Sequence, residues 1–143
     1  MEKDSQIVMP EVSRLLQQGY IIEFTPQGTS MRPYIEGGRD TVILQKPHGN
    51  VCAGDIVLAQ VGARYVLHRV IRCKGNHLTL RGDGNLQGEE HCLTSDVIGK
   101  AISIIRGQGE HAREVELHRA FVWRHLPRFV RKYRLKIMAK KHK

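Results

Sequence analysis

Three short segments of the sequence contain residue types that could together perform nucleophilic chemistry. Ser30 lies in a loop, Pro26–Pro33, that directly follows a predicted strand. A serine hydroxyl is a poor nucleophile until a base removes its proton. His68 is the natural base, because an imidazole is mostly neutral and able to accept a proton at neutral pH. Asp83, in the segment Gly82–Asn85, could then orient the imidazole through the other ring nitrogen.

His68 lies in a segment that alternates in the way a β-strand does. Within Tyr65–Arg72 it shares one face with Val66 and Val70, and the residues on either side of it point to the opposite face. A strand holds an imidazole more precisely than a loop does. The alternating pattern therefore places His68 on a rigid element.

The elements that must position these residues are short strands preceded by one helix. Apolar residues at helical spacing begin near Ser5, and Gly19 ends that pattern. Strands at this spacing predict a mainly β fold, a small body with an N-terminal helix. The predicted strands are Tyr20–Thr25, Thr41–Gln45, Asp55–Gln60, Tyr65–Arg72, Leu78–Leu80 and Val97–Ile105.

The net charge of +9 is concentrated at the C-terminal end of the chain. Residues 1–116 hold 13 Lys and Arg and all 14 Asp and Glu, whereas residues 117–143 hold ten Lys and Arg and no acid. Apolar residues in the second segment recur on one helical face, which predicts a basic amphipathic C-terminal helix. We expect this segment to contact an anionic membrane surface, with nucleic acid and a solvated end as the alternatives. That face is formed by Val122, Leu126, Phe129, Val130, Tyr133 and Ile137.

The remaining composition favours a chain that works inside the cell. The first residues carry two acids, which does not resemble a secretory leader, and no apolar run approaches the roughly 18 residues of a membrane span. The three cysteines are odd in number and widely spaced, which suits a reducing compartment. We expect the chain in the cytoplasm or on the inner membrane face. The histidines show no metal-ligand spacing, so neither a metal nor a cofactor is expected.

Five blocks of sequence, in order, carry a resemblance to a known family. The chain resembles the signal peptidase I superfamily, which also includes the LexA-type repressor peptidases. The resemblance runs from about Tyr20 to Ile105, which is most of residues 1–116. Bacterial signal peptidases carry a Lys where this chain has His68, so it is similar to the archaeal and endoplasmic-reticulum branch. The blocks are Gly28–Pro33, Gly54–Val57, His68–Ile71, Gly82–Asn85 and Val97–Lys100.

The resemblance implies a β-rich catalytic fold and a serine endopeptidase. Ser30 would be the nucleophile, His68 the base and Asp83 the third member of the site, with Asp96 as the fallback. Some relatives place a hydroxyl two residues before the nucleophile, where this chain has Gly28. The oxyanion would then rest mainly on the Ser30 N–H. The substrate implied is a peptide or protein segment with small residues near the scissile bond, and the loop residues Gly28 and Met31 would contribute to binding it.

Two rival functions and a structural interpretation of each residue stay open at this point. A self-cleaving LexA-like peptidase would use a bond such as Ala53–Gly54, but only 29 residues precede Ser30, too few for a DNA-binding domain. A catalytically silent body could instead serve as a binding module whose basic segment docks on a membrane or on nucleic acid. In that case Ser30 and Asp83 would be turn residues and His68 an ordinary strand histidine.

Overall fold

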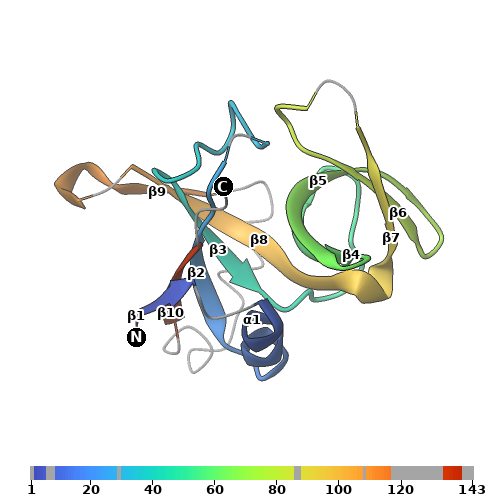
Figure 1. Ribbon diagram of the computed structural model, residues 1–143, viewed down its shortest axis with the longest axis horizontal. Coiled ribbons are helices and arrows are strands. Elements are labelled where there is room, and N and C mark those ends of the chain that lie inside the picture. The colour runs from blue at the N-terminus through green and yellow to red at the C-terminus, as the bar shows by residue number, and fades with distance from the viewer. Residues whose placement is uncertain are drawn as a thin grey trace.

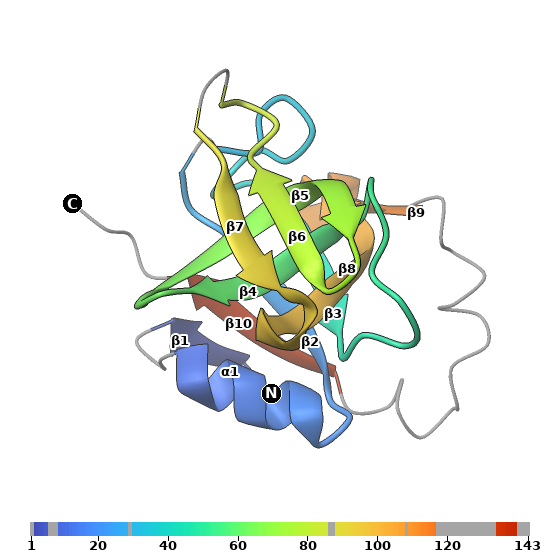
Figure 2. The same ribbon diagram turned by 90° about the vertical axis from the view of Figure 1, so that its right-hand side faces the viewer.

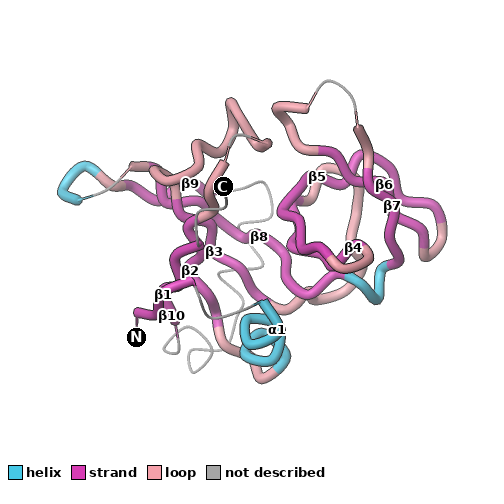
Figure 3. Tube along the Cα trace, in the orientation of Figure 1, coloured by secondary structure: helices cyan, strands magenta, loops and turns pink. Residues whose placement is uncertain are grey.

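The computed structural model of the chain describes residues 2–5, 9–28, 30–85, 88–107, 109–116 and 134–139. These residues form one α-helix, two short 3-10 turns and ten strands, and strands and loops dominate the trace (Figure 3). The helix α1 covers Met9–Gln17, and the 3-10 turns cover Thr94–Asp96 and Gly109–His111. The strands are β1 (Glu2–Ser5), β2 (Ile21–Thr25), β3 (Thr41–Gln45), β4 (Ile56–Val61), β5 (Arg64–Lys74), β6 (His77–Arg81), β7 (Glu90–Leu93), β8 (Val97–Arg106), β9 (Arg113–Glu116) and β10 (Arg134–Ala139).

All ten strands belong to one strongly curled sheet (Figure 1). The strand order is β1-β10-β2-β3-β8-β4-β5-β6-β7, and β9 pairs with β8 as a branch. β8 pairs with β3, β4 and β9, so it joins the half that contains β2 and β3 to the half formed by β4 to β7. The mainly β fold predicted from the sequence is confirmed.

The helix α1 lies at the end of the molecule opposite to the long loops (Figure 2). Its apolar stripe is buried through Val12, Leu15 and Leu16. A Cβ atom on Gly99 of β8 would lie 3.0 Å from Leu16 Cδ1, so the absence of a side chain at Gly99 lets the helix pack closely on the strand.

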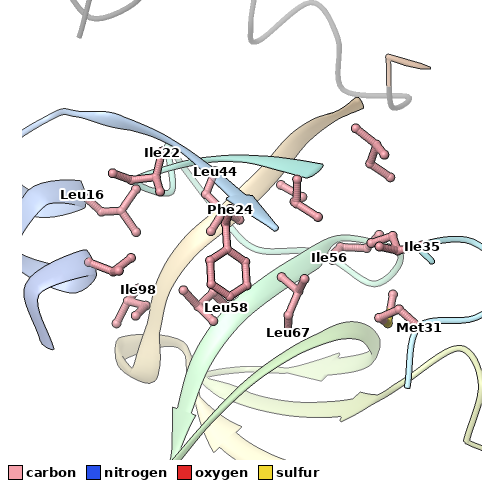
Figure 4. Close-up of a cluster of buried hydrophobic side chains, with 14 of the residues drawn as sticks. Leu16, Ile22, Phe24, Met31, Ile35, Leu44, Ile56, Leu58, Leu67 and Ile98 are labelled. Atoms are coloured by element: carbon pink, nitrogen blue, oxygen red, sulfur yellow. The ribbon is translucent and has the colours of Figure 1, made fainter. Parts of the chain in front are cut away.

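The alternation predicted for the His68 strand is confirmed by the two clusters that its side chains enter. Leu67 packs in the main core beside Leu58 and Phe24 (Figure 4). Val66 and Val70 enter a second cluster on the other face of β5. Because β5 contributes to both clusters, its register is fixed, since a one-residue shift would exchange its two faces.

Asp55 fixes the turn that precedes β4. It accepts a hydrogen bond of 2.8 Å from the Cys52 backbone amide, and Lys100 Nζ lies 3.3 Å from its carboxylate. The side chains of Asp55 and Lys100 are almost fully buried. Lys100 belongs to β8 and Asp55 directly precedes β4, so this contact ties the two strands together. Separation of a buried pair would leave an uncompensated charge and is therefore costly.

The structure differs from the sequence-based expectation at both ends of the chain. The N-terminal helix begins at Met9 rather than near Ser5, and the residues before it form β1. Arg134–Ala139 forms β10, which pairs in parallel with β1 and β2, and does not continue the predicted C-terminal helix. Strand pairing with distant segments here overrides a local helical pattern. The rest of that helix, residues 117–133 and 140–143, lies outside the described residues, as does most of the basic segment expected to meet a membrane.

No helix among the described residues is long and apolar enough to span a membrane.

The buried core predicts a large difference between two leucine substitutions. Leu44 is fully buried, so Leu44→Ala should lower the free energy of unfolding by about 2–5 kcal/mol through lost burial and a residual cavity. Leu93 is 43% exposed, and Leu93→Ala should change that free energy by only about 0.5 kcal/mol. Urea denaturation of both variants measures the difference, and equal effects would show that the packing described here is wrong.

Candidate active site

The loop that carries Ser30 connects β2 to β3 and is anchored in the core. Met31 and Ile35 are buried, and the Ile35 amide donates a hydrogen bond of 2.9 Å to the Met31 carbonyl. Figure 4 shows both side chains at the edge of the main cluster, on the side of Leu67. Two apolar anchors therefore hold the segment just after Ser30 against the sheet.

The Ser30 loop meets the turn that follows β6. The Gly84 amide donates a hydrogen bond of 2.8 Å to the Ser30 carbonyl, and the Asp83 amide donates to the Met31 sulfur at 3.4 Å. Both loops extend from the same end of the molecule in the two ribbon views (Figures 1 and 2). The sequence segments that contain Ser30 and Asp83 are thus neighbours, as the predicted site requires.

Gly82 lies between Ser30 and His68. A Cβ atom added at Gly82 would overlap the Ser30 carbonyl oxygen and would lie 3.1 Å from His68 Cδ2. Only glycine therefore allows the serine loop to lie this close to the imidazole. No hydrogen bond joins the Ser30 hydroxyl to the ring within the described structure.

His68 is held by a carboxylate on a neighbouring strand. It is 7% exposed, and its Nδ1 lies 2.6 Å from Glu90 Oε1 on β7. Only the acceptor role is open to an ionised carboxylate, so Nδ1 donates the proton of this bond. In the neutral ring, the second nitrogen, Nε2, then carries the lone pair, and this is the tautomer that a general base needs.

Glu90 occupies the position that we expected for Asp83. It follows a Gly-rich segment and begins β7, a four-residue strand that the sequence pattern did not predict. Glu90 pairs in register with Leu80 of β6, which itself pairs with Val70 of β5. Cross-strand partners share a face, and Val70 shares a face with His68, two residues before it in β5. Glu90 and His68 therefore lie on the same face of the sheet.

Asp83 binds Arg69 instead of His68. Its two carboxylate oxygens each accept a hydrogen bond of 2.8 Å from Arg69, whose third contact is a 2.8 Å bond to the Gly54 carbonyl. Arg69 follows His68 directly in β5, so the two side chains point to opposite faces of the strand. The hydrogen bonds that Arg69 donates to Asp83 raise the pKa of Arg69, so the guanidinium keeps its charge. Asp83 therefore does not orient the imidazole in this structure.

The remaining residues that the sequence singled out have structural contacts. Asp96 accepts a 2.8 Å hydrogen bond from the Leu93 amide in the turn before β8. Gly28 has a positive φ of 98°, and a Cβ on Gly37 would overlap its carbonyl, so the loop closes on itself there. Met31 is 5% exposed and packs into the core.

The described residues offer no group of three or more side chains suited to holding a metal ion. The three cysteines are free, and burial raises the pKa of the Cys92 thiol, which favours its neutral form.

Asp40 fixes the far end of the Ser30 loop. Its carboxylate is fully buried and accepts hydrogen bonds from the Glu36 amide at 2.9 Å and from the Gly107 amide at 3.1 Å. Arg39 donates two further bonds to it. Burial alone would raise the pKa of Asp40, but the bonds from Arg39 and the two backbone amides outweigh burial and lower the pKa to about 2.

This shift predicts how the stability of the loop depends on pH. A carboxyl whose pKa falls on folding stabilises the folded state above its unfolded pKa, and that stability is lost as the pH falls toward the folded value. Asp40→Asn should therefore lower the free energy of unfolding by about 2 kcal/mol at pH 6, with the difference from the wild type shrinking between about pH 4 and pH 2. Denaturation at a series of pH values tests this, and a constant difference would contradict it.

Comparisons with known proteins assign the chain to a family. The model of the family described as Peptidase S24-like matches residues 4–102, which includes Ser30, His68, Asp83 and Glu90. A comparison with curated proteins gave no match. The family match supports the superfamily of LexA-type peptidases and signal peptidase I suggested by the sequence blocks. Because the match spans more than half of its length, the chain belongs to the Peptidase S24-like family.

Proposed function

We propose that this protein is a serine endopeptidase with Ser30 as the nucleophile and His68 as the general base. The observation that carries the proposal is the meeting of the Ser30 loop and His68 at Gly82, with His68 Nδ1 bonded to Glu90 at 2.6 Å. The family match supports a serine peptidase in general terms, and the identity of the site residues is our inference. The imidazole base also fits the resemblance to the archaeal and endoplasmic-reticulum signal peptidases.

The proposed reaction is acyl transfer to serine followed by hydrolysis. His68 Nε2 takes the proton from the Ser30 hydroxyl as Oγ attacks the peptide carbonyl carbon, which gives a tetrahedral oxyanion. The Ser30 backbone N–H would donate to that oxyanion. Protonated His68 then gives its proton to the departing amine, and a water molecule, activated by the same ring, releases the acyl group from Ser30.

Glu90 acts in this scheme as a positioning residue. It keeps the proton on Nδ1, and its negative charge stabilises the imidazolium that forms when Ser30 is deprotonated. The side chains of both His68 and Glu90 are nearly buried. A charge-assisted hydrogen bond is stronger where water is largely excluded, so this placement favours proton transfer to His68.

Cleavage of a separate substrate is favoured over self-cleavage at Ala53–Gly54. The Gly54 amide donates a 2.7 Å hydrogen bond to the Val70 carbonyl, and the Gly54 carbonyl accepts the bond from Arg69. The Ala53–Gly54 peptide bond therefore lies within a hydrogen-bonded turn beside β5. An extended peptide or protein segment with small residues near the scissile bond is the proposed substrate, as the resemblance implies.

Loss of the nucleophile should abolish activity. Ser30→Ala should lower the cleavage rate of peptides with small residues at the scissile bond by roughly 10³-fold or more, since no hydroxyl remains to be acylated. Ser95→Ala, a change of the same chemistry at an exposed turn, should leave that rate unchanged. Mass spectrometry of the peptide products measures both rates. Equal cleavage by the Ser30 variant, or none by the wild type, would refute the proposal and favour a silent binding module.

Loss of the negative charge at Glu90 should slow the reaction without preventing folding. Glu90→Gln should lower kcat by roughly 10²–10⁴-fold, because the imidazolium loses its charged partner and the ring its defined tautomer. Glu89→Gln is the matched control. Glu89 is the neighbouring residue in the sequence, and it forms only a long ion pair, of 4.0 Å, with the exposed Arg72. If the two variants retain the same kcat, Glu90 has no role in positioning His68.

A further inference from the structure

We infer that Tyr34 is a positioning residue for Ser30. The aromatic ring of Tyr34 is held by Arg69 and Arg106, and it keeps the serine loop in place beside His68. Tyr34 lies four residues after Ser30, directly before the buried anchor Ile35. The inference rests on the proposed function, because it assigns a role in that same site.

The first guanidinium against the ring belongs to Arg69. Its Cζ lies 5.0 Å from the centroid of the Tyr34 ring, within the range of a cation–π contact. Asp83 and the Gly54 carbonyl hold this guanidinium through three hydrogen bonds of 2.8 Å. Arg69 is therefore a fixed surface on which the ring rests rather than a mobile side chain.

The second guanidinium belongs to Arg106, at the end of β8. Its Cζ lies 5.7 Å from the same centroid, and its Nη2 donates a 3.0 Å hydrogen bond to the Tyr34 carbonyl. Its Nε is buried and has no hydrogen-bond partner in the described structure. A buried donor without a partner is costly, and the contact with the ring stabilises the guanidinium that carries this donor.

These contacts link the position of the nucleophile to that of the base. Arg69 is the residue after His68, so β5 presents the base on one face and supports the Tyr34 ring on the other. Asp83 and Gly84 belong to one turn. The Asp83 side chain accepts hydrogen bonds from Arg69, and the Gly84 amide donates a hydrogen bond to the Ser30 carbonyl. Displacement of the loop would break the ring contact with a strand that also carries His68.

The ring, and not the hydroxyl, carries this role. Among the described residues no hydrogen bond to the Tyr34 hydroxyl is found, whereas both guanidinium groups lie against the ring. A phenylalanine at position 34 should therefore replace Tyr34 without loss, and an aliphatic side chain should not.

Two measurements on the full-length protein test the inference. The first is amide hydrogen exchange at Gly84 and Ile35, whose N–H groups donate to the Ser30 and Met31 carbonyls. The second is the rate at which a serine-directed acylating probe labels Ser30. Tyr34→Leu should speed exchange and slow acylation by about tenfold each, the loss expected for one or two cation–π contacts.

The conservative variant and a distant tyrosine serve as controls. Tyr34→Phe should stay within about threefold of the wild type in both measurements, because its ring is intact. Tyr20→Leu removes a partly buried ring that packs on the main core elsewhere and should leave both unchanged. If Tyr34→Leu does not fold, Arg106→Gln, which keeps a donor for the Tyr34 carbonyl but no cation, should show the same direction of change.

The outcomes separate this inference from the proposed function. Wild-type exchange and acylation rates in Tyr34→Leu or in the folded Arg106→Gln variant would overturn the inference, as would equal impairment of Tyr34→Phe. If exchange changes as expected but no form of the protein is acylated, the loop contact stands and the peptidase proposal fails. If the wild type is acylated and Tyr34→Leu matches it, the inference alone fails.

Discussion

The candidate site depends on the close contact between the Ser30 backbone and the turn that begins at Gly82. That contact is possible because position 82 has no side chain, and the Gly84 amide holds the Ser30 carbonyl at 2.8 Å. It brings a loop between β2 and β3 against a turn some fifty residues later in the chain, beside His68. The hydroxyl and the imidazole come from segments far apart in sequence, so their distance is set by tertiary packing and not by local structure.

Alternation along β5 divides the surroundings of the site into two functions. One face carries His68, bonded to Glu90, and is the face on which proton transfer would occur. The opposite face carries Arg69, which binds Asp83 and supports the Tyr34 ring. A single strand thus fixes both His68 and the support of the serine loop. Three register shifts, in the β3–β8, β4–β8 and β5–β6 pairings, curve the sheet around it.

The sequence predicted the strands whose apolar alternation is strong, but not the acidic partner of His68. The catalytic pairing of Ser30 with His68 stays a prediction. β7 is four residues long and contains both Glu90 and His91, so no apolar alternation marks it as a strand. Without that strand nothing placed Glu90 near the imidazole, and Asp83 was the nearest acid in a recognisable block. Strand alternation predicted that Arg69 points away from His68. It could not predict that Arg69 binds Asp83, because that contact depends on the three-dimensional position of the turn that contains Asp83. The same limit applies to β10, where a helical pattern gave way to pairing with β1 and β2.

The most direct measurement of the central claim is the position of the covalent adduct formed by a serine-directed acylating probe. The protein would be labelled, digested and mapped by mass spectrometry, alongside His68→Ala as the variant that lacks the base. The account predicts one adduct per chain, on the hydroxyl of Ser30, with strongly reduced labelling when His68 is absent. An unlabelled Ser30, or labelling of Ser30 that is independent of His68, would contradict it.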